Sequence, residues 1–177
     1  MMGKHFLPLV FILITAMNCL AQPLEAGFDK SEYLELLTIS ARSTANKNYY
    51  DSIPEPQQFS MVYQSAVMGL DNMWDLWTNH RGKSVISIRG TTLKGESWLA
   101  NLYAAMVPAK GSIRITSDYQ FNYELANDPK AAVHVGWLIS TAFLVRDMLP
   151  KIDSSYRNGT RDYLIMGHSQ GGAIAYL

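Results

Sequence analysis

Residues 165–171 read Ile-Met-Gly-His-Ser-Gln-Gly, and this stretch decides the fold. An apolar run at residues 163–166 leads into it, and the small residues Gly-Gly-Ala at positions 171–173 lead out of it. The spacing Gly-x-Ser-x-Gly between a strand and a helix is typical of a nucleophile elbow, a sharp turn that exposes a serine hydroxyl. The sequence therefore predicts strand, turn and helix here, with Ser169 at the turn.

The residue types around Ser169 fit that chemistry. A serine hydroxyl is a weak nucleophile, so it must be exposed, aimed and placed beside a base. A strained turn brings its flanking residues close to the strand and the helix, which explains glycine at Gly167 and Gly171. The N–H of Gln170 is the expected first oxyanion donor, and His168 is expected to point away from the serine. The alternative is a glycine-rich turn with a solvated serine and no catalytic role.

A second motif lies earlier in the chain. Residues 85–88 read Val-Ile-Ser-Ile, an apolar run that favours a β-strand, and residues 89–92 read Arg-Gly-Thr-Thr. Together with the elbow, this segment resembles the class 3 lipase family, the fungal-type triacylglycerol lipases, which carry Arg-Gly-Ser/Thr at the end of a central strand. The resemblance implies that Thr91 supplies a second oxyanion donor through its backbone N–H. Two preorganised donors would stabilise a tetrahedral oxyanion.

Two further segments are similar to the same family. Residues 133–137, Val-His-Val-Gly-Trp, resemble the entry into the helix before the nucleophile strand. Residues 97–102, Ser-Trp-Leu-Ala-Asn-Leu, resemble the lid region, which covers the serine and opens at a lipid surface. The alternative for this segment is an ordinary helix packed on the sheet. The expected lid residues are Trp98, Leu99 and Leu102.

The resemblance implies an α/β fold: an incomplete α/β-hydrolase with antiparallel leading strands and a parallel core, flanked by helices. Residues 22–58 are expected to form an N-terminal helix and linker. Residues 59–177 are expected to form the N-terminal part of a class 3 lipase-like domain. In that family an Asp and a His follow the serine, whereas this sequence ends eight residues after Ser169.

A fragment that lacks the catalytic acid and base is therefore expected, and the 177-residue chain alone is expected to be inactive. None of its histidines is a good candidate for the base. They are His5, His80, His134 and His168.

The N-terminus is typical of a secretory signal peptide at residues 1–21. Lys4 and His5 precede an apolar run at residues 6–17, and Ala21 ends a small-residue cleavage site. This predicts a secreted or periplasmic protein, with no stable membrane span because the run is too short. Lipoprotein processing at Cys19 is the alternative. Cys19 is the only cysteine, so the mature chain would hold no disulfide.

Composition narrows the class of protein further. The chain has 48% hydrophobic residues and a formal net charge of zero, without a basic run. One domain that can bury a core, and no nucleic-acid partner, are therefore predicted. The sequence has no metal-ligand spacing and no phosphate-binding loop, so neither metal nor cofactor is expected.

Hydrophobic periodicity gives the coarse elements. A helix is predicted at residues 28–42, a hairpin of strands at 59–67 and 73–78, and a long helix at 135–152. Irregular structure is predicted at residues 119–128. The stripe of the first helix would hold Tyr33, Leu34, Leu37 and Ala41, and the sheet core Trp74, Leu76 and Trp77.

The expected function is that of a secreted serine hydrolase, a lipase or carboxylic ester hydrolase that acts on lipid esters through an acyl-enzyme, with a lipid–water interface as the candidate place of action. Two alternatives stay open. One is a non-catalytic remnant that binds lipid or a partner. The other keeps the fold but acts as a phospholipase A1, a thioesterase or an acyltransferase.

Overall fold

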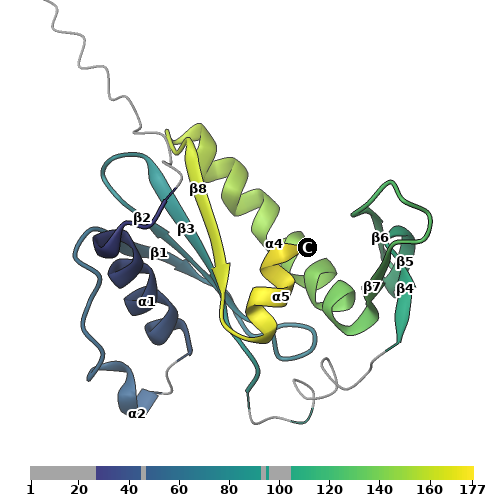
Figure 1. Cartoon of the computed structure of the whole chain (residues 1–177), viewed down its shortest axis with the longest axis horizontal. Coiled ribbons are helices and arrows are strands. Elements are labelled where there is room, and N and C mark those ends of the chain that lie inside the picture. The colour runs from purple at the N-terminus through teal and green to yellow at the C-terminus, as the bar shows by residue number, and fades with distance from the viewer. Residues whose placement is uncertain (1–26, 45–46, 93–94, 96–104) are drawn as a thin grey trace, which may run out of the picture.

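The computed structural model describes residues 27–44, 47–92, 95 and 105–177. Its centre is a four-stranded sheet in the order β1-β2-β3-β8 (Figure 1). Helix α1 covers one face of the sheet, and helices α4 and α5 cover the other. The elements are β1 (Ser60–Gln64), β2 (Trp74–Thr78), β3 (Lys83–Ile88), β8 (Asp162–Gly167), α1 (Lys30–Thr44), α4 (Val135–Arg157) and α5 (Gln170–Tyr176), with a short α2 (Lys47–Tyr50) after α1.

The sheet is mixed, as the sequence predicts. Strands β1, β2 and β3 pair in antiparallel fashion, and β8 then pairs with β3 in parallel. A parallel pair needs a crossover, and α4 lies within the segment that connects the two strands. In the parallel register Ile88 lies opposite Gly167, so both strands end at the same edge of the sheet. Strand β8 is the outer strand on that side of the described sheet.

The larger core lies between the sheet and the two later helices. It is formed by Trp74, Leu76, Ile86, Ile88, Leu144, Met148 and Ile174. A polar link crosses it at Asp147 of α4, which accepts hydrogen bonds from the Tyr63 hydroxyl at 3.0 Å and from Trp74 Nε1 at 2.9 Å. The indole of Trp74 is fully buried, and this link satisfies its polar atom.

The smaller core lies under α1, and here the predicted helix face is wrong. Tyr33, Leu34 and Leu37 are exposed. The buried side of the helix carries Ile39 and Ser43 instead. The apolar residues of α1 form two overlapping faces, and polar contacts select between them: the Ser43 hydroxyl bonds to Oδ2 of the buried Asp75 at 2.5 Å. Around it, Ile39, Phe59, Trp77 and Val85 make the core.

Two ribbons stand beside the N-terminal half of α4 (Figure 1). One pairs β4 (Met106–Pro108) with β7 (Ala132–His134), and the other pairs β5 (Lys110–Thr116) with β6 (Tyr119–Glu124). The prediction of irregular structure is therefore wrong for residues 119–124. Tyr119, Phe121 and Tyr123 alternate with more exposed residues, which is the period of a strand, and the Tyr119 hydroxyl donates to the Ala142 carbonyl at 3.0 Å.

Helix α4 ends at Arg157, five residues beyond the predicted end at residue 152, and Pro150 lies inside it. The signal-peptide prediction at residues 1–21 and the lid residues Trp98, Leu99 and Leu102 lie outside the described residues. Within the described part of the chain, no helix has the length and apolar character that a membrane crossing requires.

The buried carboxyl of Asp75 makes the stability of the fold depend on pH. Burial raises the pKa of Asp75 above its ordinary value, although the hydrogen bond with Ser43 acts against it. As pH rises, the unfolded state ionises first, so stability falls between the unfolded-state and folded-state pKa values. We expect Asp75→Asn to gain stability relative to the parent as pH rises above about 4.

Thermal unfolding at several pH values measures this effect. Ser43→Ala is the control, since it keeps the carboxyl and removes a hydrogen bond that lowers its pKa, so the loss of stability with rising pH should persist and extend to higher pH. A difference in melting temperature between Asp75→Asn and the parent that stays constant with pH would contradict the prediction.

Candidate active site at the carboxyl ends of two parallel strands

The turn after β8 holds Ser169 in an unusual backbone conformation. Its φ is 53° and its ψ is −120°, a region that side-chain-bearing residues rarely occupy. Ser169 is the residue before α5, yet its side chain makes no capping hydrogen bond to that helix. The residue is exposed. The hydroxyl is therefore held at the surface by the backbone and is not used by the helix.

Close packing explains the glycines on both sides. A Cβ on Gly167 would overlap the Gly171 carbonyl and would lie 2.6 Å from the Gly172 nitrogen. A Cβ on Gly171 would overlap the Ile88 carbonyl and would lie 2.9 Å from the Arg89 carbonyl oxygen. Real Cβ atoms do not approach backbone atoms so closely, so any larger residue would force strand and helix apart.

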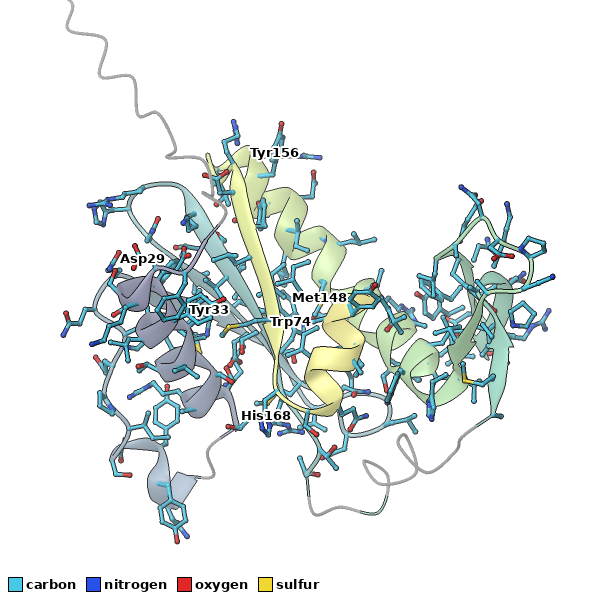
Figure 2. The ribbon with its side chains drawn as sticks, viewed as in Figure 1. Asp29, Tyr33, Trp74, Met148, Tyr156 and His168 are labelled. Carbon is cyan, nitrogen blue, oxygen red and sulfur yellow. The ribbon has the colours of Figure 1, made fainter. Side chains whose placement is uncertain are left out.

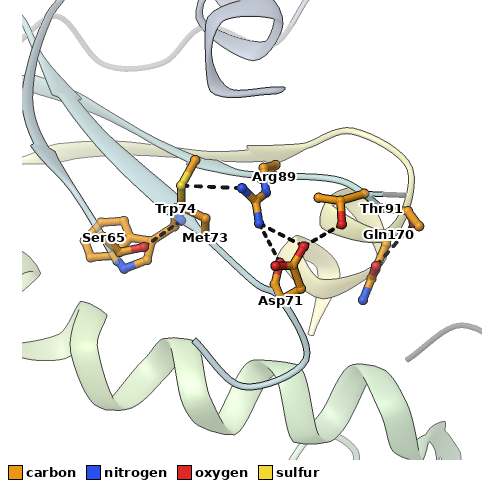
Figure 3. A network of polar contacts seen from close by, with 8 residues as sticks. Ser65, Asp71, Met73, Trp74, Arg89, Thr91 and Gln170 are labelled. Atoms are coloured by element: carbon orange, nitrogen blue, oxygen red, sulfur yellow. Dashed lines mark hydrogen bonds and ion pairs between the residues drawn. The ribbon is translucent and has the colours of Figure 1, made fainter. Parts of the chain in front are cut away.

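The same geometry brings the Arg-Gly-Thr-Thr segment beside the elbow. Residues 89–92 leave β3 where Ile88 pairs with Gly167. A Cβ on Gly90 would lie 2.5 Å from the His168 carbonyl oxygen, so the two turns touch through their backbones. The Thr91 hydroxyl donates to the Gln170 side-chain oxygen at 3.2 Å (Figure 3). The two residues expected to carry the oxyanion donors are thus brought together.

The sequence did not single out the residues that anchor this strand end. Arg89 Nη2 donates to the Asp71 carbonyl oxygen at 2.7 Å and pairs with its carboxylate at 3.2 Å. The Thr92 hydroxyl donates to the same carboxylate at 2.5 Å. Arg89 itself could have indicated that a partner lies nearby, because a charged side chain at the end of a buried strand needs one.

The described histidines are not arranged to activate Ser169. His80 lies in the turn between β2 and β3, at the other end of the sheet. His134 stacks on Trp137 at 4.5 Å between ring centroids. His168 is exposed at the elbow (Figure 2). Among the described residues, none forms a hydrogen bond with the Ser169 side chain.

A cavity of about 780 Å³ opens at the far end of the sheet, away from the elbow, and is lined in part by Phe28, His80 and Asp162. Three charged groups of its wall are bonded: Lys83 Nζ donates to Glu32 at 2.9 Å, and Glu35 accepts the N–H groups of residues 57 and 58 at 3.0 and 2.9 Å. Across the described residues, no three His, Cys, Asp or Glu side chains gather as a metal site requires. We therefore place the candidate site at Ser169.

The mixed sheet and its flanking helices define an α/β-hydrolase-like protein, and the solved structures that it resembles are fungal lipases. The family model described as Lipase (class 3) matches residues 85–177, which is more than half of the chain. The chain belongs to the class 3 lipase family.

Three solved structures illustrate the fold. A fungal lipase–inhibitor complex superposes with a TM-score of 0.61 and 17% identity, over 81% of this chain and 51% of that one. A triacylglycerol lipase superposes with a TM-score of 0.57 and 17% identity, over 81% of this chain and 51% of that one. The lipase of Rhizopus microsporus var. chinensis superposes with a TM-score of 0.54 and 17% identity, over 81% of this chain and 47% of that one. The chain thus spans about half the length of these lipases. No curated protein matches its sequence significantly.

The strain at Ser169 is measurable. Ser169→Gly and Ser169→Ala both remove the hydroxyl, but only glycine adopts a φ of 53° freely. We expect the glycine variant to be more stable than the alanine variant by about 1 kcal/mol in urea unfolding.

The same pair at the exposed Ser154, inside α4, should give the opposite order, because glycine is about 1 kcal/mol worse than alanine in a helix. An alanine variant at 169 that equals or exceeds the glycine variant would show that the turn is not strained.

Proposed function

We propose that the protein is a serine hydrolase of carboxylic esters, with Ser169 as its nucleophile. One observation carries the proposal: the parallel register of β3 and β8 brings a strained, exposed serine beside an Arg-Gly-Thr-Thr strand end, with Thr91 bonded to Gln170 at 3.2 Å. The three residues come from the ends of two strands and the start of a helix, so the fold itself holds them in place.

In the proposed reaction, Ser169 Oγ forms a bond to the ester carbonyl carbon and gives its proton to a general base. The carbonyl electron pair moves to oxygen, and the N–H groups of Thr91 and Gln170 stabilise this oxyanion. The intermediate then expels the alcohol, which leaves with the proton, and an acyl-enzyme remains. Water repeats the sequence and releases the carboxylic acid.

The donors are preorganised in this proposal. The Thr91 and Gln170 side chains bond to each other, and residues 89–92 are anchored to Asp71. Donors that are already in place need no reorganisation as the charge develops, and each is worth about 3 kcal/mol of transition-state stabilisation in related chemistry. Gly167 and Gly171 serve the elbow, and His168 flanks it.

We infer that the substrates are lipid esters and that the protein is secreted or periplasmic. One of the matched structures is of a triacylglycerol lipase whose catalytic centre is a serine protease triad, and another is offered as a model for interfacial activation. The apolar segment at residues 97–102 and the apolar N-terminal run support the same inference, as a lid and a signal peptide. A phospholipase A1, thioesterase or acyltransferase would share the site, and a panel of such substrates separates them.

The general base and its orienting acid come, in this proposal, from outside the described residues, since none of those residues reaches the Ser169 hydroxyl. This same observation favours one competing function, a lipid-binding protein without turnover. The two differ in whether Ser169 becomes reactive.

A fluorophosphonate probe tests the proposal, since it bonds covalently to activated serines. The natural gene product, at the length at which the cell makes it, should be labelled at Ser169 and should hydrolyse p-nitrophenyl esters. Ser169→Ala should lose both properties, by about a thousandfold or more in turnover.

Ser154→Ala is the matched control, because it removes another exposed serine hydroxyl at the far end of α4. Labelling that persists in Ser169→Ala would overturn the assignment of the nucleophile. Binding to liposomes with neither labelling nor turnover would favour the lipid-binding function.

A further inference from the structure

Asp71 is a buried acidic residue for which the proposed chemistry has no use. It is 6% exposed, lies in the loop between β1 and β2, and has a φ of 61°. The loop is closed by a bridge in which Met68 and Asn72 exchange backbone hydrogen bonds at 2.9 and 2.8 Å. It also packs on α4, because a Cβ on Gly69 would lie 2.5 Å from the Phe143 ring. The loop therefore holds Asp71 in a fixed position.

From this loop Asp71 contacts the segment that follows β3. Its carboxylate accepts the Arg89 guanidinium at 3.2 Å and the Thr92 hydroxyl at 2.5 Å. Its backbone carbonyl accepts the same guanidinium at 2.7 Å. A carboxylate can accept several hydrogen bonds at once, and such bonds to charged groups are the strong ones. One residue thus fixes two points on the segment that leaves β3.

Those two points enclose the proposed oxyanion donor. Between Arg89 and Thr92 lie only Gly90 and Thr91, so the peptide N–H of Thr91 sits in a span anchored at both ends. The backbone of Arg89 is fixed too, since its N–H donates to the Met73 carbonyl at 3.0 Å. Movement at either anchor would shift the Thr91 donor, and oxyanion stabilisation depends on donor distances of about 3 Å.

We propose that Asp71 is a positioning residue for the oxyanion hole, acting through Arg89 and Thr92 on the Thr91 peptide. The inference rests on the proposed function, and it adds a residue from outside both motifs to that site. Asp71 contacts no reacting atom in this scheme. Its contribution is to hold a donor still, so its loss should reduce kcat and the binding of transition-state analogues far more than it changes KM.

The alternative hypothesis is a purely structural role for Asp71, because a buried ion pair also supports the fold. A matched control separates the two. Asp147 is likewise a carboxylate that accepts two side-chain hydrogen bonds, from Tyr63 and Trp74, but it serves α4 and not the strand end. Asn adopts a left-handed backbone as readily as Asp, so Asp71→Asn changes the side-chain contacts without straining the loop.

The test compares Asp71→Asn, Thr92→Val and Asp147→Asn in the natural gene product. Turnover of p-nitrophenyl butyrate gives kcat and KM, and a boronic acid that forms a tetrahedral serine adduct gives an inhibition constant. We expect Asp71→Asn to lower kcat by about 10- to 100-fold, with a parallel loss of boronate affinity and little change in KM. Thr92→Val should act in the same direction but less, and Asp147→Asn should lower only the melting temperature.

Amide hydrogen exchange over residues 89–92 gives a second readout that does not need activity. Exchange there should rise in Asp71→Asn and in Thr92→Val, but not in Asp147→Asn. If Asp71→Asn does not fold, Thr92→Val carries the test.

The proposed function and this inference fail in different ways. An inactive wild-type protein would overturn the first, and exchange would still decide whether Asp71 holds the strand end. In an active protein, unchanged kcat in the Asp71 and Thr92 variants would overturn the positioning role. Unchanged exchange over residues 89–92 would overturn it in either case.

Discussion

The parallel pairing of β3 with β8 is the constraint on which the rest of the structure depends. These strands are far apart in sequence, and their register places Ile88 opposite Gly167. Because parallel strands end at the same edge, the residues that follow both strands must meet there. The crossover that makes the pairing possible contains α4, and α4 supplies Leu144 and Met148 to the larger core. The pairing of β3 with β8 therefore underlies both the sheet core and the candidate site.

The strained backbone at Ser169 persists because the packing around the turn does not let it relax. A backbone in this region costs on the order of 1–3 kcal/mol, so the turn would relax if the packing allowed it. It does not relax, because α5 is held against β3 by Gly171 at the backbone and by Ile174 in the core. The burial of one aliphatic side chain contributes about 1.5–3 kcal/mol, which is enough to offset a strained residue.

Short-range patterns predicted the parts of the structure that local geometry decides. The elbow and the end of β3 each depend on a few neighbouring residues, so glycine and apolar runs revealed them. The face of α1 was not predictable in this way, because its apolar residues allow two faces and a distant residue, Asp75, selects one through Ser43. Asp71 falls between the two predicted strands of the hairpin. Its partners lie 18 and 21 residues further along the chain, and a single sequence carries no sign of that contact.

Within the described sheet, the strand that aims Ser169 is also the outermost one. Its Ile165 side chain is 55% exposed, and the backbone groups along its open side are a template for another strand. Anything that adds to that margin would bond to the same backbone that ends in the strained turn. The open border and the serine turn therefore belong to one strand, and a partner strand at that border would contact the element that carries Ser169.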